Sequence, residues 1–334
     1  MGNPEVTVQV VTAGEALVDL VEQADGSLLP CAGGSVFNFT RALAAQGVAT
    51  GYLNPLSRDG FGRLLADTLV RSGVTLAAPE PVAEPTSLAV VSVDEAGQPA
   101  YSFHREGVAD RAVDSASLFE RTQRWRGVEA VCTGCLALAP QDGERYLPWL
   151  RACREDGLAV VVDANLRPSV MDAPALWRAS VLAALGLADL VKVSEEDLRH
   201  LLPGSDDPLA AAAGLFATGP AQLVALTLGG AGALLLARDG RVWQARECAE
   251  LQVADTVGAG DSFLAGLVAG LLAEGGLQRR SGSDIASAAA ARALARAVAS
   301  ASHCVQQRGC VPPHADEVER ALARGTVQVE ALQR

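Results

Sequence analysis

A repeated alternation of short apolar runs with longer segments rich in Ala and Leu limits this chain to few folds. The apolar runs are Val6 to Val11, Ala130 to Cys132, Leu158 to Val162, Leu190 to Val193 and Leu223 to Leu228. The segments between them include Phe37 to Gln46, Gly60 to Ser72, Gly143 to Asp156, Ala173 to Leu187 and Pro208 to Ala217. Strands that alternate with helices predict parallel strands with crossover helices on both faces. We therefore expect an α/β sandwich.

One interval lacks the intervening helix. Thr86 to Val93 and Ala100 to Arg105 read as strands on either side of DEAGQP, a connection rich in turn residues. Val18 to Glu22 and Leu28 to Leu29 form a second, smaller hairpin pattern around Ala-Asp-Gly. We expect the two hairpins to pair as a small antiparallel sheet that covers a site as a lid.

The chain shows no internal repeat and no linker rich in Pro, Ser or charge. We therefore expect a single principal domain over residues 1–334, with a discontinuous lid at approximately 18–32 and 86–106.

Charge and composition narrow the class of partner. The 334 residues are 49% hydrophobic, enough for a sizeable core, and carry a net charge of -12. An acidic surface disfavours nucleic acids and anionic membranes, so a small molecule is the expected partner. Met1 to Thr12 lacks the pattern of a signal peptide, and Ile285 to Ala301 contains two arginines and reads as a soluble helix.

Seven cysteines are scattered along the chain, an odd number that suits free thiols in a reducing compartment. We expect a cytoplasmic protein. Cys132 and Cys135 form a C-x-x-C pair, but no second ligand pair stands at the spacing of a zinc site. We interpret these two cysteines as small buried residues.

The segment VADTVGAGDSFLAG, Val253 to Gly266, predicts an anion site. Gly258, Ala259 and Gly260 precede an apolar helix expected to begin near Asp261 or Ser262. Amide groups at a helix start, together with the helix dipole, bind anions without a lysine. Glycine also lets the backbone approach a phosphate closely.

Carboxylates stand at both ends of this segment. Asp261 can be a helix cap, or it can accept a proton from an attacking hydroxyl while the amides stabilise a transferring phosphoryl group. The neighbouring anion site favours the second role. Asp255 can hold a cation together with backbone carbonyls, or it can anchor the turn, and the residues alone leave both roles open.

The stretch DTVGAGDSF resembles the signature of the ribokinase-like (PfkB) carbohydrate kinases. Further segments resemble that family in its order: GEALVD at Gly14 to Asp19, GGSVFNFTRALAAQG at Gly33 to Gly47, DGFG at Asp59 to Gly62, DANLRP at Asp163 to Pro168, KVSEEDL at Lys192 to Leu198 and TLGGAGALL at Thr227 to Leu235. YSFHREGVADR, Tyr101 to Arg111, is closest to bacterial fructokinases, although His104 replaces their usual tyrosine.

The resemblance implies a Rossmann-like α/β sandwich in three layers whose β-lid pairs with another subunit, giving a homodimer. It implies ATP as phosphoryl donor, with Mg²⁺ on the phosphates. Asp261 takes the position of the catalytic base, and Gly258, Ala259 and Gly260 form the anion hole. Asp255 and Val257 match the loop that binds an activating monovalent cation, usually K⁺.

The resemblance also assigns binding residues. The sugar contacts are Asp19, Gly33, Gly34 and Asn38, with Arg105 and Arg167 as further candidates. The ATP side has Ser194, Thr227, Gly229, Gly232 and His303, and Asp197 would act on Mg²⁺ through water. TLGGAGALL lacks the third glycine of a dinucleotide fingerprint, so a nicotinamide site is disfavoured.

The leading hypothesis is an ATP-dependent sugar kinase that phosphorylates fructose. The rival among enzymes is a 2-keto-3-deoxygluconate kinase, in which an arginine pair would receive the substrate carboxylate. The alternative outside enzymes is a sugar-binding regulator on a kinase fold, and the intact Asp261 and anion hole argue against it.

Overall fold

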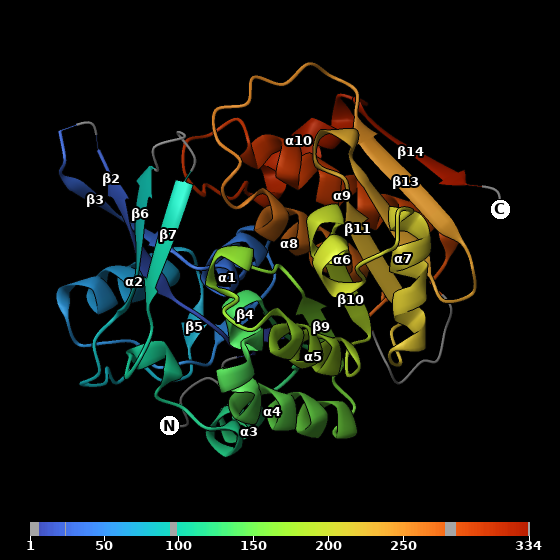
Figure 1. The fold of residues 1–334 in the computed structure, drawn as a ribbon. Coiled ribbons are helices and arrows are strands. Elements are labelled where there is room, and N and C mark those ends of the chain that lie inside the picture. The colour runs from blue at the N-terminus through green and yellow to red at the C-terminus, as the bar shows by residue number, and fades with distance from the viewer. Residues whose placement is uncertain (1–6, 24, 94–98, 278–284, 333–334) are drawn as a thin grey trace, which may run out of the picture.

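The computed structural model describes residues 7–23, 25–93, 99–277 and 285–332 (Figure 1). Its strands are β1 (Val10–Thr12), β2 (Leu17–Glu22), β3 (Leu28–Gly33), β4 (Thr50–Tyr52), β5 (Thr75–Leu76), β6 (Ser87–Val93), β7 (Pro99–His104), β8 (Ala130–Gly134), β9 (Ala159–Asp163), β10 (Leu190–Ser194), β11 (Leu223–Thr227), β12 (Ala233–Ala237), β13 (Val242–Glu247) and β14 (Val327–Leu332). Its helices are α1 (Ser35–Ala45), α2 (Gly60–Arg71), α3 (Ser115–Gln123), α4 (Gly143–Glu155), α5 (Pro174–Leu185), α6 (Glu195–Leu201), α7 (Pro208–Gly214), α8 (Ala259–Ala273), α9 (Ser287–Cys304) and α10 (Ala315–Ala323).

Within the described residues, a large sheet of ten strands runs in the order β14-β13-β12-β11-β10-β9-β8-β1-β4-β5. Between β11 and β5, every pair of adjacent strands in this order is parallel. On β9, Val160 and Val162 enter one hydrophobic cluster, while Ala159 and Val161 enter another on the opposite face. Successive side chains of a strand point to opposite faces, so a strand buried on both faces is apolar at every position.

Helices bury their apolar faces on both sides of this sheet. Leu150 of α4 and Val181 of α5 pack into the first cluster. Leu43 of α1, Leu267 of α8 and Leu294 of α9 pack into the second. The expected α/β sandwich in three layers is therefore confirmed, and the α8 side carries the glycine-rich turn.

Three strands at one edge depart from the expected pattern. β12, β13 and β14, which were not among the predicted strands, are antiparallel to their neighbours. Residues 228–232 connect β11 to β12, and residues 238–241 connect β12 to β13. Both connections are too short for the crossover that parallel pairing requires.

The small sheet has the order β3-β2-β6-β7 and stands at the upper left of Figure 1, away from β13 and β14. β2 and β6 pair in parallel, with Leu17 beside Ser87, so the expectation of an antiparallel sheet is wrong at its centre. The reason is that α1, β4, α2 and β5 intervene between β3 and β6, which frees the direction of β6 from that of β2. Residues 94–98 of the DEAGQP turn lie outside the described residues.

Some element boundaries differ from those expected. β1 begins at Val10, well after Val6, which itself lies outside the described residues. α8 begins at Ala259, two residues before the expected start, and α9 covers most of the soluble helix expected in residues 285–301. In the described ranges, no helix has both the length and the apolar character needed to cross a membrane.

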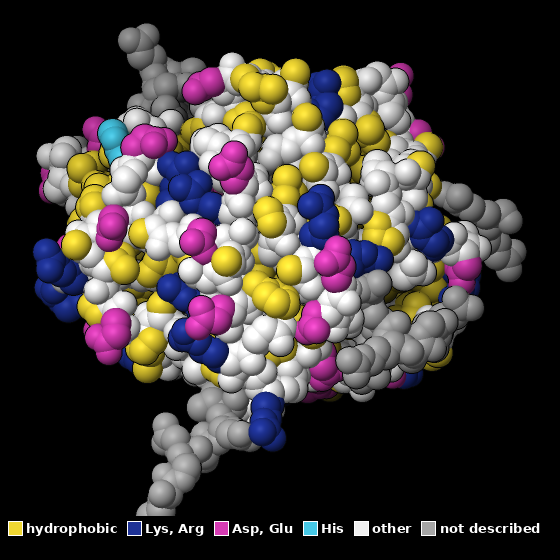
Figure 2. Space-filling model, turned by 90° about the horizontal axis from the view of Figure 1, so that it is seen from below, with side chains coloured by type: hydrophobic (Ala, Val, Ile, Leu, Met, Phe, Trp, Pro, Cys, Tyr) yellow, Lys and Arg dark blue, Asp and Glu magenta, His cyan; other side chains and the backbone are white. Residues whose placement is uncertain are grey.

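Figure 2 shows acidic and basic side chains interspersed over one face of the molecule. With a net charge of -12, acidic residues predominate over the whole chain. An interspersed arrangement keeps the local potential on this face smaller than the net charge suggests.

Candidate active site

The turn before α8 is the centre of the candidate site. Gly258 precedes the helix with φ of 76°, a left-handed conformation that favours glycine. A Cβ atom on Gly258 would lie 2.2 Å from Sγ of Cys310, and one on Gly260 would lie 3.2 Å from Nζ of Lys192. A side chain is therefore excluded at Gly258, whereas at Gly260 it would crowd the end of the Lys192 side chain.

This turn presents the start of α8 to the candidate site. The first amides of a helix have no intrahelical acceptors, so they are suited to an anion. Of the predicted anion-hole residues, Ala259 donates its amide to the carbonyl of Thr256 at 3.3 Å. Because α8 begins at Ala259, Asp261 lies in its first turn and close to the same amides.

Asp261 is buried and held by a chain of side-chain hydrogen bonds. Oγ of Ser35 donates to Oδ1 of Asp261 at 2.7 Å. Nδ2 of Asn165 donates to Oγ of Ser35 at 2.6 Å, and Nη1 of Arg167 donates to Oδ1 of Asn165 at 2.6 Å. This series of hydrogen bonds fixes the orientation of the Asp261 carboxylate and links it to Arg167, a predicted sugar contact.

Burial raises the pKa of Asp261 above its usual range. Hydrogen bonds from Ser35 and Asn38 and the charges of Lys192 and Arg167 act in the opposite direction. A carboxylate with a raised pKa is a stronger proton acceptor than an exposed one, and the two cations hold it in the charged form that a base requires.

The predicted sugar contacts gather beside this carboxylate. A Cβ atom on Gly33 would lie 2.2 Å from Oδ2 of Asp19, and one on Gly34 would lie 3.0 Å from the carbonyl of Glu15. Oδ1 of Asn38 is buried without a hydrogen-bond partner in the described part of the chain. A glycine cradle beside unsatisfied oxygen acceptors suits a ligand rich in hydroxyl groups.

Arg105 lies in an ionic cluster at the base of the small sheet. Its guanidinium is 3.6 Å from carboxylate oxygens of both Asp110 and Asp142, and it donates to the carbonyl of Leu136 at 3.3 Å. These contacts already engage the side chain. Its contact with substrate stays a prediction, whereas its contacts with Asp110, Asp142 and Leu136 are present in the structure.

Lys192 is a site residue that the sequence analysis left without a role. It is buried on β10, and its Nζ lies 3.0 Å from Oδ1 of Asp163. Burial disfavours its charge, but the carboxylates of Asp163, Asp197 and Asp261 outweigh burial and raise its pKa. The structure therefore places an ammonium group directly against the turn that carries Gly260.

Ser35, Asn165 and Asp163 were also overlooked as site residues. Asp163 and Asn165 follow the buried strand β9, and polar residues at the carboxyl end of a parallel strand are a signal for a site. Asn165 has φ of 35°, an unusual value for a residue other than glycine. The turn aims its amide at Ser35, which explains the conformation.

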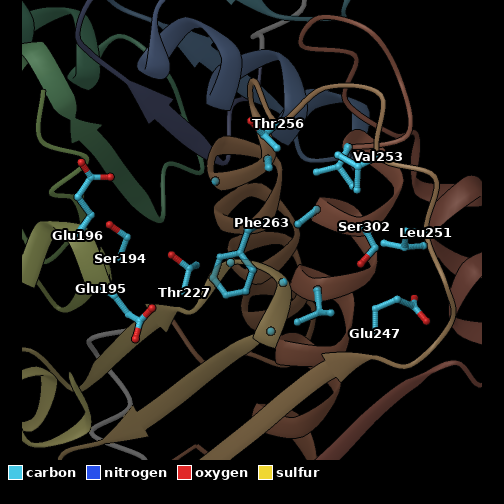
Figure 3. Close-up of a pocket in the computed structure, with 18 of the residues that line it drawn as sticks. Ser194, Glu195, Glu196, Thr227, Glu247, Leu251, Val253, Thr256, Phe263 and Ser302 are labelled. Atoms are coloured by element: carbon cyan, nitrogen blue, oxygen red, sulfur yellow. The ribbon is translucent and has the colours of Figure 1, made fainter. Parts of the chain in front are cut away.

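A cavity of about 640 Å³ lies on the other side of the turn (Figure 3). Predicted nucleotide contacts that line it are Ser194, Thr227, Gly229 and Gly232, and Ala259 and Gly260 also reach it. In Figure 3, the ring of Phe263 lies at its centre, with apolar side chains beyond it. This volume and this mixture of apolar and polar groups are typical of a cofactor site.

Two predicted nucleotide-side residues have structural partners. Asp197 receives the amide and hydroxyl of Ser194 at one carboxylate oxygen and the amide of Leu166 at the other. It thereby caps α6, and its action on Mg²⁺ stays a prediction. His303 is absent from the residues that line the described cavity; its Nε2 lies 3.7 Å from Oε1 of Glu317.

Asp255 anchors the turn through both carboxylate oxygens. They accept the amides of Val257 at 3.0 Å and Gly309 at 2.9 Å. The carbonyl of Val257 lies 3.6 Å from Sγ of Cys304. The anchoring role is thus visible, and binding of a monovalent cation by Asp255 and Val257 stays a prediction.

The turn at the start of α8 thus lies near both the Asp19–Gly33 cluster and the cavity, and comparison with known proteins shows which family has this arrangement. The model of the pfkB family carbohydrate kinase matches residues 9–317. This chain belongs to the pfkB family of carbohydrate kinases. It is therefore a phosphotransferase that acts on a sugar hydroxyl.

Relatives of this kinase include fructokinases. The fructokinase of Klebsiella pneumoniae is 32% identical over 314 residues, covering 92% of this chain and 97% of the relative. The fructokinase of Rhizobium leguminosarum bv. trifolii is 32% identical over 278 residues, covering 81% of this chain and 82% of the relative.

Solved structures support the same fold. Fructokinase from Vibrio cholerae O395, in a form bound to fructose, ADP and calcium ion, has a TM-score of 0.76 at 26% identity and covers 95% of this chain and 100% of that chain. Fructokinase from Xylella fastidiosa with bound ATP has a TM-score of 0.81 at 24% identity and covers 95% of this chain and 98% of that chain. The ribokinase-like fold expected for this kinase is confirmed.

We predict that Lys192→Met lowers kcat of this kinase by on the order of 10², because an ammonium beside the anion-binding turn is lost. The single variant also leaves Asp163 buried without its cation, so we expect it to be less stable. The double variant Lys192→Met with Asp163→Asn should recover stability in urea denaturation without recovering kcat. Recovery of both would assign Lys192 a structural role alone.

Burial raises the pKa of Asp19 to about 6, with the charge of Arg167 acting against the shift. As the pH falls through this value, Asp19 takes up a proton and becomes a weaker acceptor for sugar hydroxyls. We expect the KM for sugar, measured between about pH 5 and 8, to rise toward acid. Asp19→Asn should have a high KM without this rise, and a flat wild-type profile would contradict the assignment.

Proposed function

We propose that this protein is an ATP-dependent fructokinase. The observation that carries the proposal is the position of Asp261, in the first turn of α8, between the cradle of Asp19, Gly33 and Gly34 and the cavity lined by Gly260. A sugar hydroxyl in the cradle and a phosphoryl donor in the cavity would meet at this carboxylate. The fructokinases among its relatives favour fructose as acceptor.

The chain's own residues account for the proton transfer. Asp261 accepts the proton of the attacking hydroxyl, and the hydrogen bond from Ser35 holds the carboxylate in place. Amides of Gly258 and Gly260, with the ammonium of Lys192, stabilise negative charge on the transferring phosphoryl group. Asn38 and Arg167 orient the sugar beside the base.

We propose ATP, Mg²⁺ and K⁺ as cofactors. ATP fits the cavity in volume, and the carboxylates of Glu195 and Glu196 add oxygen ligands at its rim, near Asp197. Bound Mg²⁺ supplies charge neutralisation on the donor phosphates. K⁺ would be held by Asp255 and the carbonyl of Val257, which the Gly309 contact keeps close to the turn.

The structure favours fructose over 2-keto-3-deoxygluconate. A substrate carboxylate would require an arginine pair with free charge. Arg105 is paired with Asp110 and Asp142, so its charge is largely compensated inside the protein. Arg167 lies near Asp19 but also faces the charges of Asp261 and Asp163, so neither arginine offers the uncompensated charge that an acid substrate needs.

A coupled ADP-release assay over fructose, ribose, 2-keto-3-deoxygluconate, tagatose and nucleosides tests the proposal. We expect fructose to have the highest kcat/KM. Asp261→Asn should lower kcat by on the order of 10² to 10⁴ while sugar binding, measured by calorimetry, changes little. Wild-type turnover in the Asp261→Asn variant, or a clear preference for the acid sugar, would contradict the proposal.

The same assay distinguishes an enzyme from a regulator and tests the monovalent cation. Replacing K⁺ by a large organic cation should lower kcat, and Asp255→Asn should reduce the difference between the two salts. Absence of ADP release with every sugar of the panel would favour the sugar-binding regulator. Equal rates in both salts would remove the cation role of Asp255 and Val257.

We further propose that the small sheet is a lid that pairs with a second copy of the chain in the cytoplasm. Leu28, Leu29 and Tyr101 on this sheet expose 47%, 52% and 41% of their surface, which is unusual for apolar side chains. Each of the seven cysteines is free, in keeping with a reducing compartment.

We expect sedimentation velocity to give the mass of a dimer for the wild type and of a monomer for Leu28→Ser with Leu29→Ser. Leu176→Ser is the matched control, because Leu176 is also exposed but lies on helix α5, outside the small sheet. A monomeric wild type, or dissociation caused by the control, would contradict pairing through the small sheet.

A further inference from the structure

Two thiols lie together behind the turn of the active site. Cys304 is the last residue of α9, and Cys310 follows in the next loop. A side-chain hydrogen bond links the two thiols, and neither is in a disulfide. Cys304 is buried and Cys310 is half-buried, so Cys310 is the more exposed of the two residues.

Both cysteines contact the backbone that forms the anion site. Sγ of Cys304 donates to the carbonyl of Val257 at 3.6 Å. Sγ of Cys310 fills the space beside Gly258, where even one added carbon atom would overlap it at 2.2 Å. Any movement of either sulfur therefore reaches the turn at the start of α8.

The loop between the two cysteines also holds the extended stretch of chain that leads into the turn, through backbone hydrogen bonds. The carbonyl of Val305 accepts the amides of Ala254 at 2.8 Å and Asp255 at 3.2 Å. The amide of Gly309 donates to Oδ2 of Asp255 at 2.9 Å. The loop and the turn thus form one connected unit, and a covalent bond within the loop constrains both.

We propose that Cys304 and Cys310 form a reversible disulfide that lowers the turnover of the kinase by displacing the Val257–Gly258 turn. This proposal rests on the proposed role of that turn in phosphoryl transfer. A disulfide brings two sulfur atoms to about 2.05 Å. The bond removes the thiol hydrogen that Val257 accepts and pulls Cys310 away from its position against Gly258.

A peroxide is the oxidant class that the site admits. One sulfur, as thiolate, attacks a peroxide oxygen, and the hydroxide that leaves becomes water on taking up a proton. The second thiol attacks the resulting sulfenic sulfur, and the hydroxyl leaves with the thiol proton as another water. Two sulfurs lose two electrons in total and peroxide gains them. A small dithiol reverses the bond by thiol–disulfide exchange.

Peptide mapping tests the bond independently of activity. Trypsin cleaves after Arg308, between the two cysteines, so the disulfide joins peptides 297–308 and 309–320. We expect this joined product in wild-type protein treated with hydrogen peroxide, and its loss after dithiothreitol. Cys248→Ala, which removes an exposed thiol elsewhere, should still give the product, whereas Cys310→Ser should not.

Activity tests the consequence. We expect peroxide to lower the kcat for fructose by about tenfold, reversibly, in the wild type and in Cys248→Ala. The expected loss is smaller than the loss of kcat on complete removal of one oxyanion donor, because the turn is displaced and its amides are kept. Cys310→Ser and Cys310→Ala should keep the reduced rate and lose the sensitivity. Absence of the joined peptide, or unchanged kcat when it forms, would overturn the proposal; a reduced wild type inactive on every sugar would instead contradict the proposed function.

Discussion

The burial of Asp261 at the start of α8 is the constraint on which the rest of the site depends. A carboxylate taken from water requires compensating charge and hydrogen bonds. Ser35 supplies a hydrogen bond, and Lys192 and Arg167 supply charge. These groups come from α1, β10 and the segment after β9. The environment of the proposed base is therefore complete only when the whole sandwich has folded.

The same compensation explains why the site needs both of its glycines. The lack of a side chain at Gly260 leaves room for the ammonium of Lys192, and Cys310 can pack under the turn only because Gly258 has no side chain. The positive end of α8 and the ammonium then act on the same small volume. Gly258 and Gly260 thus allow Cys310 and Lys192 to approach the turn closely, in addition to the close approach of a phosphate that glycine permits.

Different edges of the two sheets contribute different parts of the candidate site. Parallel strands carry polar residues to one edge, where Asp163 and Ser194 end β9 and β10. The antiparallel strands β12 to β14 extend the sheet beside the cavity, and the small sheet itself carries Asp19 and Gly33 of the proposed sugar cradle. The loop after α9 closes the arrangement by holding Asp255, which connects the turn to the cysteine pair.

The sequence by itself determined the layered α/β fold, the glycine-rich turn and the family, because periodicity and local motifs are properties of short segments. It also singled out Asp19, Asn38 and Asp261 as candidate site residues, because they lie in such motifs. Only the tertiary structure decided that Lys192 faces Gly260, that Arg105 is neutralised by Asp110 and Asp142, and that β2 pairs in parallel with β6. These contacts join residues far apart in the chain, and no local pattern encodes which partners meet when the layers pack.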